Sequence, residues 1–304
     1  MNNNPTLYAG VDGGGTKCCA ILFNHKGEEI AKGIAGAANA ARDLPCTLNS
    51  IVSSIELALQ QANLTSVKLS QIKVGAGLAG ACVPDVKAKL LAWQHPFADF
   101  CVDSDLAAAC YGAHAGNDGA LLIVGTGSSA ARLQKGQLTQ FGGHGFLLGD
   151  KGSGSWFGRS AVSSTLEAGD RIIPTGELHK LVMSTLDVKN NVELLQCMIN
   201  ASASEFAALA PLVVELAKQD EPTALALVAD GVTYLDTLCQ QTLSNTDLSL
   251  VLMGGLAPSL EPWFSSVIRE RIVTTRGGPE WGAVRLLKSD FPLVSENMCV
   301  ECMS

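Results

Sequence analysis

The feature that most constrains the fold is a pattern that occurs twice along the chain. Each copy has a short apolar segment, a glycine-rich turn and two further short segments of strand character. The first copy covers residues 7–34 and turns at residues 13–15, whereas the second covers residues 120–141 and turns at residues 125–128. Apolar or alternating runs of this length, separated by glycine and polar turns, predict strands. The repeat therefore predicts two similar α/β halves, each with a mixed sheet.

The remaining segments complete the two halves. In the first half, helices and strands are expected in turn at residues 43–62, 72–76, 84–93, 99–102 and 105–114. In the second half, a helical insertion between residues 153 and 244 precedes strands at residues 248–253 and near 267–274, and a last helix from Pro279. We place the domain boundary after Ala115, which gives an N-terminal lobe of residues 1–115 and a C-terminal lobe of residues 116–304.

The charge balance argues against two classes of partner. The chain has 21 Lys and Arg against 29 Asp and Glu, a net charge of −8, and no basic cluster. We therefore expect neither nucleic acid nor an acidic membrane surface as a partner. The longest stretch without a charged side chain, residues 136–149, is glycine-rich and shorter than the about 20 apolar residues of a membrane helix. No signal peptide is recognised at the N-terminus, so a cytoplasmic protein is expected.

The ten cysteines are expected to be reduced thiols, because no export signal is recognised. Cys299 and Cys302 form the one C-x-x-C motif. A structural zinc site needs about four ligands, and neither a second cysteine pair nor a histidine pair stands near this motif in the sequence. We interpret it as an accessible dithiol in the tail, and the sequence gives it no role.

The first glycine turn carries groups that suit a bound phosphate. Three consecutive glycines remove every Cβ there, so that backbone N–H groups can approach an anion closely. Thr16 adds a hydroxyl, and Asp12 supplies a carboxylate where a hydrated Mg²⁺ would sit. The alternative is an ordinary tight hairpin, which rarely needs three glycines. The turn is not a Walker loop, because Lys17 follows Thr16 and no G-K-[ST] occurs in the chain.

Two further glycine motifs occupy matching places in the second half. Residues 125–128, Gly-Thr-Gly-Ser, stand where the first half has its glycine turn. Two such hairpins, one in each half, can face each other and hold a polyphosphate. Gly254 and Gly255 follow the strand expected at residues 248–253, where the absence of side chains would let a flat adenine approach the backbone. Taken alone, this pair is only a turn between a strand and a helix.

Two aspartates stand where a strand gives way to a helix. Ligands of open α/β sheets bind beyond the carboxyl ends of the strands. A carboxylate there can accept a proton from an attacking hydroxyl group. For Asp105 the purely structural alternative is a helix N-cap. The spacing alone does not choose between Asp105 and Asp103.

The segment at residues 142–154 is rich in glycine and serine and contains His144 and Asp150. Such a loop is expected to be shaped around a polar ligand. A lone histidine is more often structural than catalytic, so His144 either contacts the ligand or has a structural role.

A G-x-G-x-x-G pattern at residues 75–80 suggests a dinucleotide site, with Asp99 or Asp103 at the place of the ribose carboxylate. However, a dinucleotide fingerprint belongs to the first strand of its sheet, and this segment follows a three-stranded meander. We interpret these glycines as a site of close packing between a strand and a helix.

In order along the chain, these motifs resemble the phosphate-1, connecting, phosphate-2 and adenosine segments of the actin/hexokinase/Hsp70 ATPase superfamily. In detail, residues 10–16, 104–105, 125–128 and 149–153 resemble the N-acetylglucosamine and glucosamine kinases of the BadF/BadG/BcrA/BcrD ATPase family. The resemblance implies two ribonuclease H-like lobes that close over ATP, Mg²⁺ and a small sugar. It implies phosphorylation of the 6-hydroxyl of an amino sugar, with N-acetylglucosamine expected first and glucosamine as the alternative. Dimers are common in this family, so a homodimer is allowed.

The resemblance also assigns roles to individual residues. Asp105 takes the place of the general base, and Asp12 that of a carboxylate that holds Mg²⁺ through water. The sugar-contacting positions are Asn39, Asp105, Gly143, His144 and Asp150. The nucleotide-contacting positions are Asp12, Gly13, Gly14, Gly15, Thr16, Lys17, Gly125, Thr126, Gly127, Ser128, Gly254 and Gly255.

Two points keep alternatives open. Many N-acetylglucosamine kinases have Gly-Trp-Gly where this chain has His144 between glycines, which leaves the choice between glucosamine and its N-acetyl form undecided. The family also contains activator ATPases that drive a partner enzyme and hold an iron–sulfur cluster with cysteines of the second half. This chain has no cysteine between Cys110 and Cys197, which argues against that activity. A sugar-sensing repressor on the same fold would need a DNA-binding module, which this acidic chain does not suggest.

Overall fold

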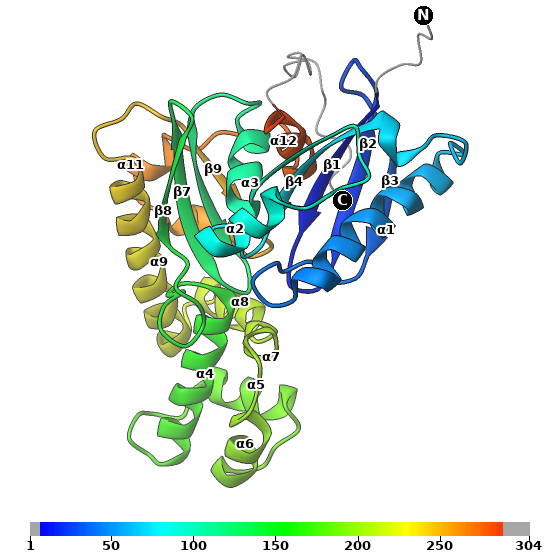
Figure 1. The fold of residues 1–304 in the computed structure, drawn as a ribbon. Coiled ribbons are helices and arrows are strands. Elements are labelled where there is room, and N and C mark those ends of the chain that lie inside the picture. Colours follow the sequence, from blue (N-terminus) through cyan, green and yellow to red (C-terminus); the bar gives the residue numbers. More distant parts are fainter. Residues whose placement is uncertain (1–6, 288–304) are drawn as a thin grey trace, which may run out of the picture. The chain divides into compact units, whose positions relative to one another are not determined.

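The computed structural model describes residues 7–287, which form two compact units (Figure 1). Within these residues, unit 1 comprises 7–119, 133–138 and 274–287, and unit 2 comprises 120–132 and 139–273. The units differ from the lobes expected from the sequence mainly at the C-terminal end. There, residues 274–287 pack with the first unit instead of the second.

Unit 1 is built on a five-stranded sheet with the order β3-β2-β1-β4-β5. Strands β1, β2 and β3 form the antiparallel meander expected from the repeat, and β4 and β5 continue the sheet parallel to β1. The strands are Leu7–Gly13 (β1), Cys18–Phe23 (β2), Glu29–Ala35 (β3), Ile72–Leu78 (β4) and Asp99–Ser104 (β5). The parallel strands β1, β4 and β5 consequently end at one edge of the sheet.

Helices cover both faces of this sheet (Figure 1). Helix α1 (Leu44–Gln61) packs Ile51 and Ile55 against the odd-numbered side chains of β1, and Asp43 caps its first turn as expected. Tyr8 points to the opposite face, where it packs near α12 (Pro279–Arg285). Helix α3 (Asp105–Ala113) lies beside α12, whereas the short η1 (Leu69–Gln71) precedes β4 and α2 (Pro84–Leu91) follows it.

Glycines allow α12 to lie directly on the sheet and on α3. Gly10 and Gly75 are register partners in β1 and β4, and a Cβ on either would overlap the backbone of α12. Gly282 of α12 and Gly112 of α3 open the same kind of gap between the two helices. The interpretation of the G-x-G-x-x-G pattern as a site of close packing is therefore confirmed at Gly75.

Unit 2 repeats the arrangement with the sheet order β8-β7-β6-β9, in which β9 is parallel to β6. The strands are Gly119–Val124 (β6), Ser128–Gln134 (β7), Gln137–Gly142 (β8) and Leu250–Met253 (β9). The predicted α/β class with two mixed sheets is thus confirmed. The helical insertion is also present, as Gly154–Gly169 (α4), Glu177–Thr185 (α5), Asn191–Met198 (α6), Ala203–Ala207 (α7), Ala210–Lys218 (α8) and Pro222–Thr242 (α9).

The prediction of a strand near residues 267–274 is wrong. This region instead begins with α11 (Ser266–Arg269), after α10 (Ala257–Leu260) and η2 (Glu261–Trp263), and only Ile272 forms a single bridge, to Leu250. The reason is a helix cap: the Ser265 hydroxyl accepts a hydrogen bond from the backbone N–H of Ile268. Asp236 of α9 in turn accepts hydrogen bonds from the backbone and the hydroxyl of Ser265, which fixes this turn.

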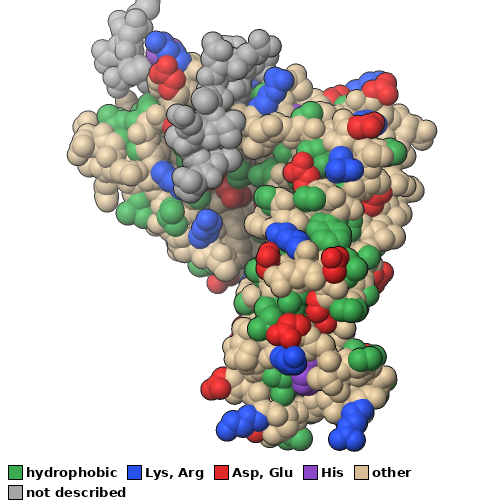
Figure 2. Space-filling model, turned by 180° about the vertical axis from the view of Figure 1, so that it is seen from behind, with side chains coloured by type: hydrophobic (Ala, Val, Ile, Leu, Met, Phe, Trp, Pro, Cys, Tyr) green, Lys and Arg blue, Asp and Glu red, His purple; other side chains and the backbone are tan. Residues whose placement is uncertain are grey.

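Two expectations concern the surface and the cysteines. Within residues 7–287, no helix combines the length and the apolar character that crossing a membrane requires. On the face drawn in Figure 2, acidic and basic side chains are interspersed over the helical insertion. The cysteines of this part of the chain are all free thiols, whereas Cys299 and Cys302 lie outside the described residues.

The packing of α12 predicts an unusual response to a glycine substitution. In an ordinary helix interior, Gly→Ala stabilises by up to about 1 kcal/mol. Gly282→Ala is expected instead to destabilise unit 1 by about 1–3 kcal/mol, because the new Cβ would overlap the carbonyl oxygen of Ala108. Urea unfolding measures the change. Gly36→Ala is the control, because its Cβ would lie 3.7 Å from the Ser50 hydroxyl, an ordinary contact. Equal stability of the two variants would contradict the prediction.

Candidate functional site

The first part of the site lies where the parallel strands of unit 1 end. Asp12 of β1, Gly77 of β4 and Asp103 of β5 stand side by side in register. The missing side chain of Gly77 lets the start of α3 approach the sheet, since a Cβ there would lie 3.4 Å from the Cα of Asp105. The charges of Asp12 and Asp105 consequently interact. The structure thus brings together two residues that the sequence assigned to separate motifs, the first glycine turn and the start of α3.

The surroundings of Asp103 and Asp105 distinguish the two carboxylates. Ser104, not Asp105, is the N-cap of α3, because the Ser104 hydroxyl accepts the backbone N–H of Ala107 at 3.1 Å. The structural alternative for Asp105 is therefore wrong. Asp103 pairs with the Lys87 ammonium at 2.9 Å, whereas Asp105 forms no salt bridge within the described residues.

The carboxylate of Asp105 is therefore available to a ligand. Its Oδ1 accepts the backbone N–H of Leu106 at 2.9 Å. Burial raises the pKa of this carboxyl, and the backbone N–H groups of Leu106 and of Asp105 itself partly offset that rise. A buried carboxylate with a raised pKa is a better proton acceptor than an exposed one. This arrangement favours Asp105 over Asp103 as the candidate general base.

Negative charge is concentrated around Asp12. Burial raises the pKa of Asp12 to about 6, with further contributions from Glu280 and Asp105, while Lys17 acts in the opposite direction. A cation at this point would relieve the repulsion. Mg²⁺ keeps most of its waters and takes only one or two carboxylates. The donor set therefore fits a hydrated Mg²⁺ held by Asp12. Sequence reasoning did not find Glu280.

The glycines of the first turn divide into two kinds. Gly13 is required by packing, since a Cβ there would lie 2.6 Å from Leu78 and 2.9 Å from Ala38. Gly14 would meet only one atom, at 3.8 Å, and Gly15 would meet none within 4 Å. Neither has a positive φ. The fold of the chain therefore gives no reason for these two glycines, and the space above them is open to a ligand.

The two glycine motifs of unit 2 divide in the same way. A Cβ on Gly127 would lie 2.7 Å from Oδ2 of Asp150, while a Cβ on Gly125 would meet nothing within 4 Å. Gly254 has a φ of +96° and abuts Val124, while Gly255 is again open. In each motif, one glycine is thus needed by the fold and another leaves bare backbone accessible. Such bare turns are suited to the phosphates and the adenosine of a nucleotide.

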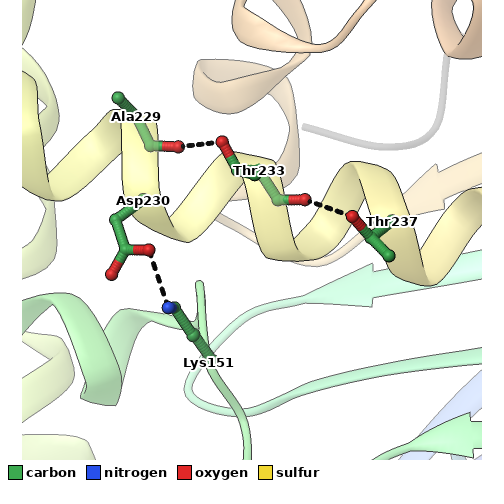
Figure 3. Close-up of polar contacts among 5 residues, drawn as sticks. All are labelled: Lys151, Ala229, Asp230, Thr233 and Thr237. Atoms are coloured by element: carbon green, nitrogen blue, oxygen red, sulfur yellow. Dashed lines mark hydrogen bonds and ion pairs between the residues drawn. The ribbon is translucent and has the colours of Figure 1, made fainter.

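The turn at residues 125–128 is held in place by the segment that follows β8. The backbone N–H of Gly154 donates to the carbonyl of Gly125 at 2.8 Å, and that of Ser155 to the carbonyl of Thr126 at 3.1 Å. The hydroxyl of Ser128 donates to the carbonyl of Lys151 at 3.0 Å. The ammonium of Lys151 pairs with Asp230 of α9 at 2.7 Å (Figure 3). In the same part of α9, the hydroxyls of Thr233 and Thr237 donate to the carbonyls of Ala229 and Thr233.

Asp150 lies at the centre of this segment. It is buried, adopts a φ of +57°, and its Oδ1 accepts the backbone N–H of Gly145 at 3.1 Å. Burial raises the pKa of Asp150, while the Gly145 N–H and nearby His144 act against that rise. His144 is exposed, as is Gly143. Asp150 is therefore an acceptor with the polar His144 beside it, and contact of this loop with a ligand stays a prediction.

Asn39 is held in one orientation in unit 1. Its side-chain oxygen accepts the backbone N–H groups of Ala41 and Arg42, each at 3.2 Å. A Cβ on Gly80, which has a φ of +82°, would lie 2.9 Å from the same oxygen. Because the oxygen is committed to the turn, the amide NH₂ group is the part of Asn39 that can donate to a ligand.

Comparison with known proteins identifies the family. Residues 9–278 match the sequence profile of the BadF/BadG/BcrA/BcrD ATPase family. The chain belongs to this family. It is 29% identical to a glucosamine kinase of Vibrio cholerae, over 91% of this chain and 94% of the relative. It is 24% identical to an N-acetyl-D-glucosamine kinase of Dictyostelium discoideum, over 82% and 85% of the two chains.

The solved structures agree with this assignment. A protein of Chromobacterium violaceum named as a candidate N-acetylglucosamine kinase superposes with a TM-score of 0.84 at 29% identity, covering 93% of this chain and 99% of that one. A ROK hexokinase of Thermus thermophilus, 16% identical with a TM-score of 0.54 and covering 93% and 97%, shares the fold. The resemblance read from the glycine motifs is therefore confirmed for the family and the fold.

The division of the glycines predicts opposite effects for two neighbouring substitutions. Gly125→Ala is expected to change the unfolding free energy by less than about 0.5 kcal/mol but to weaken ADP binding by about tenfold or more, because its Cβ fills space left for the ligand. Gly127→Ala is the matched control and is expected to destabilise the protein through the clash with Asp150. Calorimetric titration with ADP and urea unfolding test both. Unchanged ADP affinity of Gly125→Ala would contradict the assignment.

The raised pKa of Asp12 predicts a pH dependence of stability. The folded protein holds this proton up to about pH 6, whereas the ordinary carboxyl value is 3.8. The unfolding free energy contributed by Asp12 therefore falls as pH rises from about 4 to about 6. Asp12→Asn removes this loss, so its advantage over the wild type should grow across that interval by up to about 3 kcal/mol. Urea unfolding at several pH values measures it, and a pH-independent difference would contradict the prediction.

Proposed function

We propose that this chain is an amino-sugar kinase, which transfers the terminal phosphoryl group of ATP to the 6-hydroxyl of glucosamine or N-acetylglucosamine. The observation that carries the proposal is Asp105, a half-buried carboxylate that caps no helix and forms no salt bridge within residues 7–287, beside Asp12 and an open glycine turn. The relatives support the amino-sugar class, because the two named above act on glucosamine and on N-acetyl-D-glucosamine.

The chemistry requires positioning and charge stabilisation more than covalent participation of the protein. Phosphoryl transfer passes through a loose transition state, so oriented donors near the phosphates and a well-placed acceptor for the hydroxyl proton account for most of the catalysis. Asp105 would orient the 6-hydroxyl and accept its proton. Mg²⁺, held through water at Asp12, would neutralise charge on the phosphates. The bare turns at Gly14 and Gly15 in unit 1, and at Gly125 in unit 2, would receive the phosphates.

The sugar would be recognised through its hydroxyl groups. The carboxylate of Asp150 is an acceptor for sugar hydroxyls, and the amide of Asn39 is a donor. His144 stands beside Asp150, where it would lie near a substituent of the sugar. A polar side chain at this position suits a free amine as well as an acetamido group, so the substituent on C2 is for the assay to decide.

The experiment compares Asp105→Asn with Asp103→Asn. Asp105→Asn is expected to lower kcat by about 10²- to 10⁴-fold, the contribution of a general base, with ADP affinity preserved. Asp103→Asn loses the half-exposed ion pair with Lys87, which contributes about 0–1 kcal/mol, keeps an oxygen acceptor for the Ser104 N–H, and should keep most of the turnover. Steady-state kinetics with both amino sugars, together with calorimetric ADP binding, test the pair. Near-normal turnover of Asp105→Asn would overturn the role of this residue.

A further inference from the structure

Glu280 is a buried carboxylate that the roles proposed above leave unused. It is the second residue of α12 and is 9% exposed. Its backbone carbonyl lies directly against Gly10 of β1, so closely that any Cβ on Gly10 would overlap it. This backbone contact fixes Glu280 on the face of the sheet that β1 presents to α12.

The side chain of Asp12 lies on the same face. Side chains two residues apart in a strand share a face, which places Asp12 on the side of Gly10 and therefore of α12. Cys19 is the register partner of Asp12 in β2. The thiol of Cys19 hydrogen-bonds to Glu280, and burial together with that contact raises its pKa to about 12. Asp12 and Glu280 thus approach the same buried cysteine from β1 and α12.

The nearby charge of Lys17 offsets only part of the negative charge at Asp12. Within residues 7–287, neither Asp12 nor Glu280 forms a salt bridge. Two like charges in a partly buried site repel each other more strongly than in water, because the local dielectric constant is lower. The repulsion is relieved when a divalent cation binds at Asp12, so that part of the binding free energy of the cation comes from Glu280.

We propose that Glu280 is a positioning residue that acts through Asp12 and strengthens the binding of the hydrated Mg²⁺ that accompanies the nucleotide. The inference rests on the proposed function, in which Asp12 holds that ion. The side chain of Glu280 need not touch the ion or the substrates. Its position is set by the packing of α12 on Gly10 and Gly75, so the C-terminal helix contributes to a site formed by N-terminal residues.

A purely structural role would give a different result. An acidic residue in the first turn of a helix stabilises the helix dipole, and the thiol of Cys19 needs an acceptor. If these were its only roles, loss of the charge would lower the stability of the protein without changing its response to Mg²⁺. If Glu280 acts through Asp12, loss of its charge would relieve repulsion in the metal-free protein and weaken the attraction for the cation.

The test uses Glu280→Gln, which keeps the shape and an oxygen acceptor for Cys19 but removes the charge. Binding of ADP is measured by calorimetry at increasing Mg²⁺, without sugar, and thermal unfolding is measured without metal or nucleotide. We expect the half-saturating Mg²⁺ concentration to rise about three- to tenfold and the melting temperature of the metal-free protein to stay equal or rise. Glu29→Gln is the control, because it removes an exposed carboxylate of unit 1 whose charge acts on Glu280 but not on Asp12.

The outcomes separate this inference from the proposed function. An unchanged Mg²⁺ response of Glu280→Gln, or a lowered melting temperature with an unchanged response, would overturn the role of Glu280 while leaving the kinase proposal standing. A wild-type protein that binds no Mg²⁺–ADP would overturn both. A wild-type protein that binds Mg²⁺–ADP but phosphorylates no sugar would overturn only the kinase proposal.

Discussion

The direct packing of α12 on the backbone of β1 and β4 determines the geometry at the strand edge of unit 1. Gly10 and Gly75 remove the side chains that would separate the helix from the sheet, and Gly282 and Gly112 do the same between α12 and α3. Asp12 lies at the end of β1 and Asp105 begins α3, so that one helix is in contact with both elements that carry these carboxylates. Backbone-to-backbone packing of this kind leaves little freedom for either residue to shift.

The three glycine motifs share a feature. In each, one glycine packs so closely that a Cβ would overlap a neighbour: Ala38 and Leu78 at Gly13, Asp150 at Gly127, and Val124 at Gly254. A Cβ would meet nothing within 4 Å at the neighbouring Gly15, Gly125 and Gly255, and only one atom, at 3.8 Å, at Gly14. The closely packed glycine fixes the conformation of each turn, and the glycine with free space beside it leaves its backbone exposed. Rigid turns with exposed donors cost little reorganisation when an anion binds, which is the basis of electrostatic preorganisation.

Local sequence signals predicted most of the secondary structure and the motifs, because strands, turns and caps depend on neighbouring residues. The doubled strand pattern, the cap at Asp43 and the long helix α9 are examples. What the sequence left open depends on distant residues. The pairing of Asp103 with Lys87 and the cap at Ser104 separate two aspartates that spacing alone could not. Similarly, the cap at Ser265 depends on Asp236, and the approach of Glu280 to Asp12 depends on packing between opposite ends of the chain.

In the proposed function, the carboxylate of Asp105 and the open glycine turns serve the transfer of a phosphoryl group to an amino sugar. The most direct measurement is ADP release by the purified protein with Mg²⁺–ATP, comparing no sugar, glucose, glucosamine and N-acetylglucosamine. We expect ADP to appear in step with the phosphorylated sugar, and only when an amino sugar is present. ADP release at the same rate with and without sugar would contradict it, and would indicate an ATPase that drives a partner.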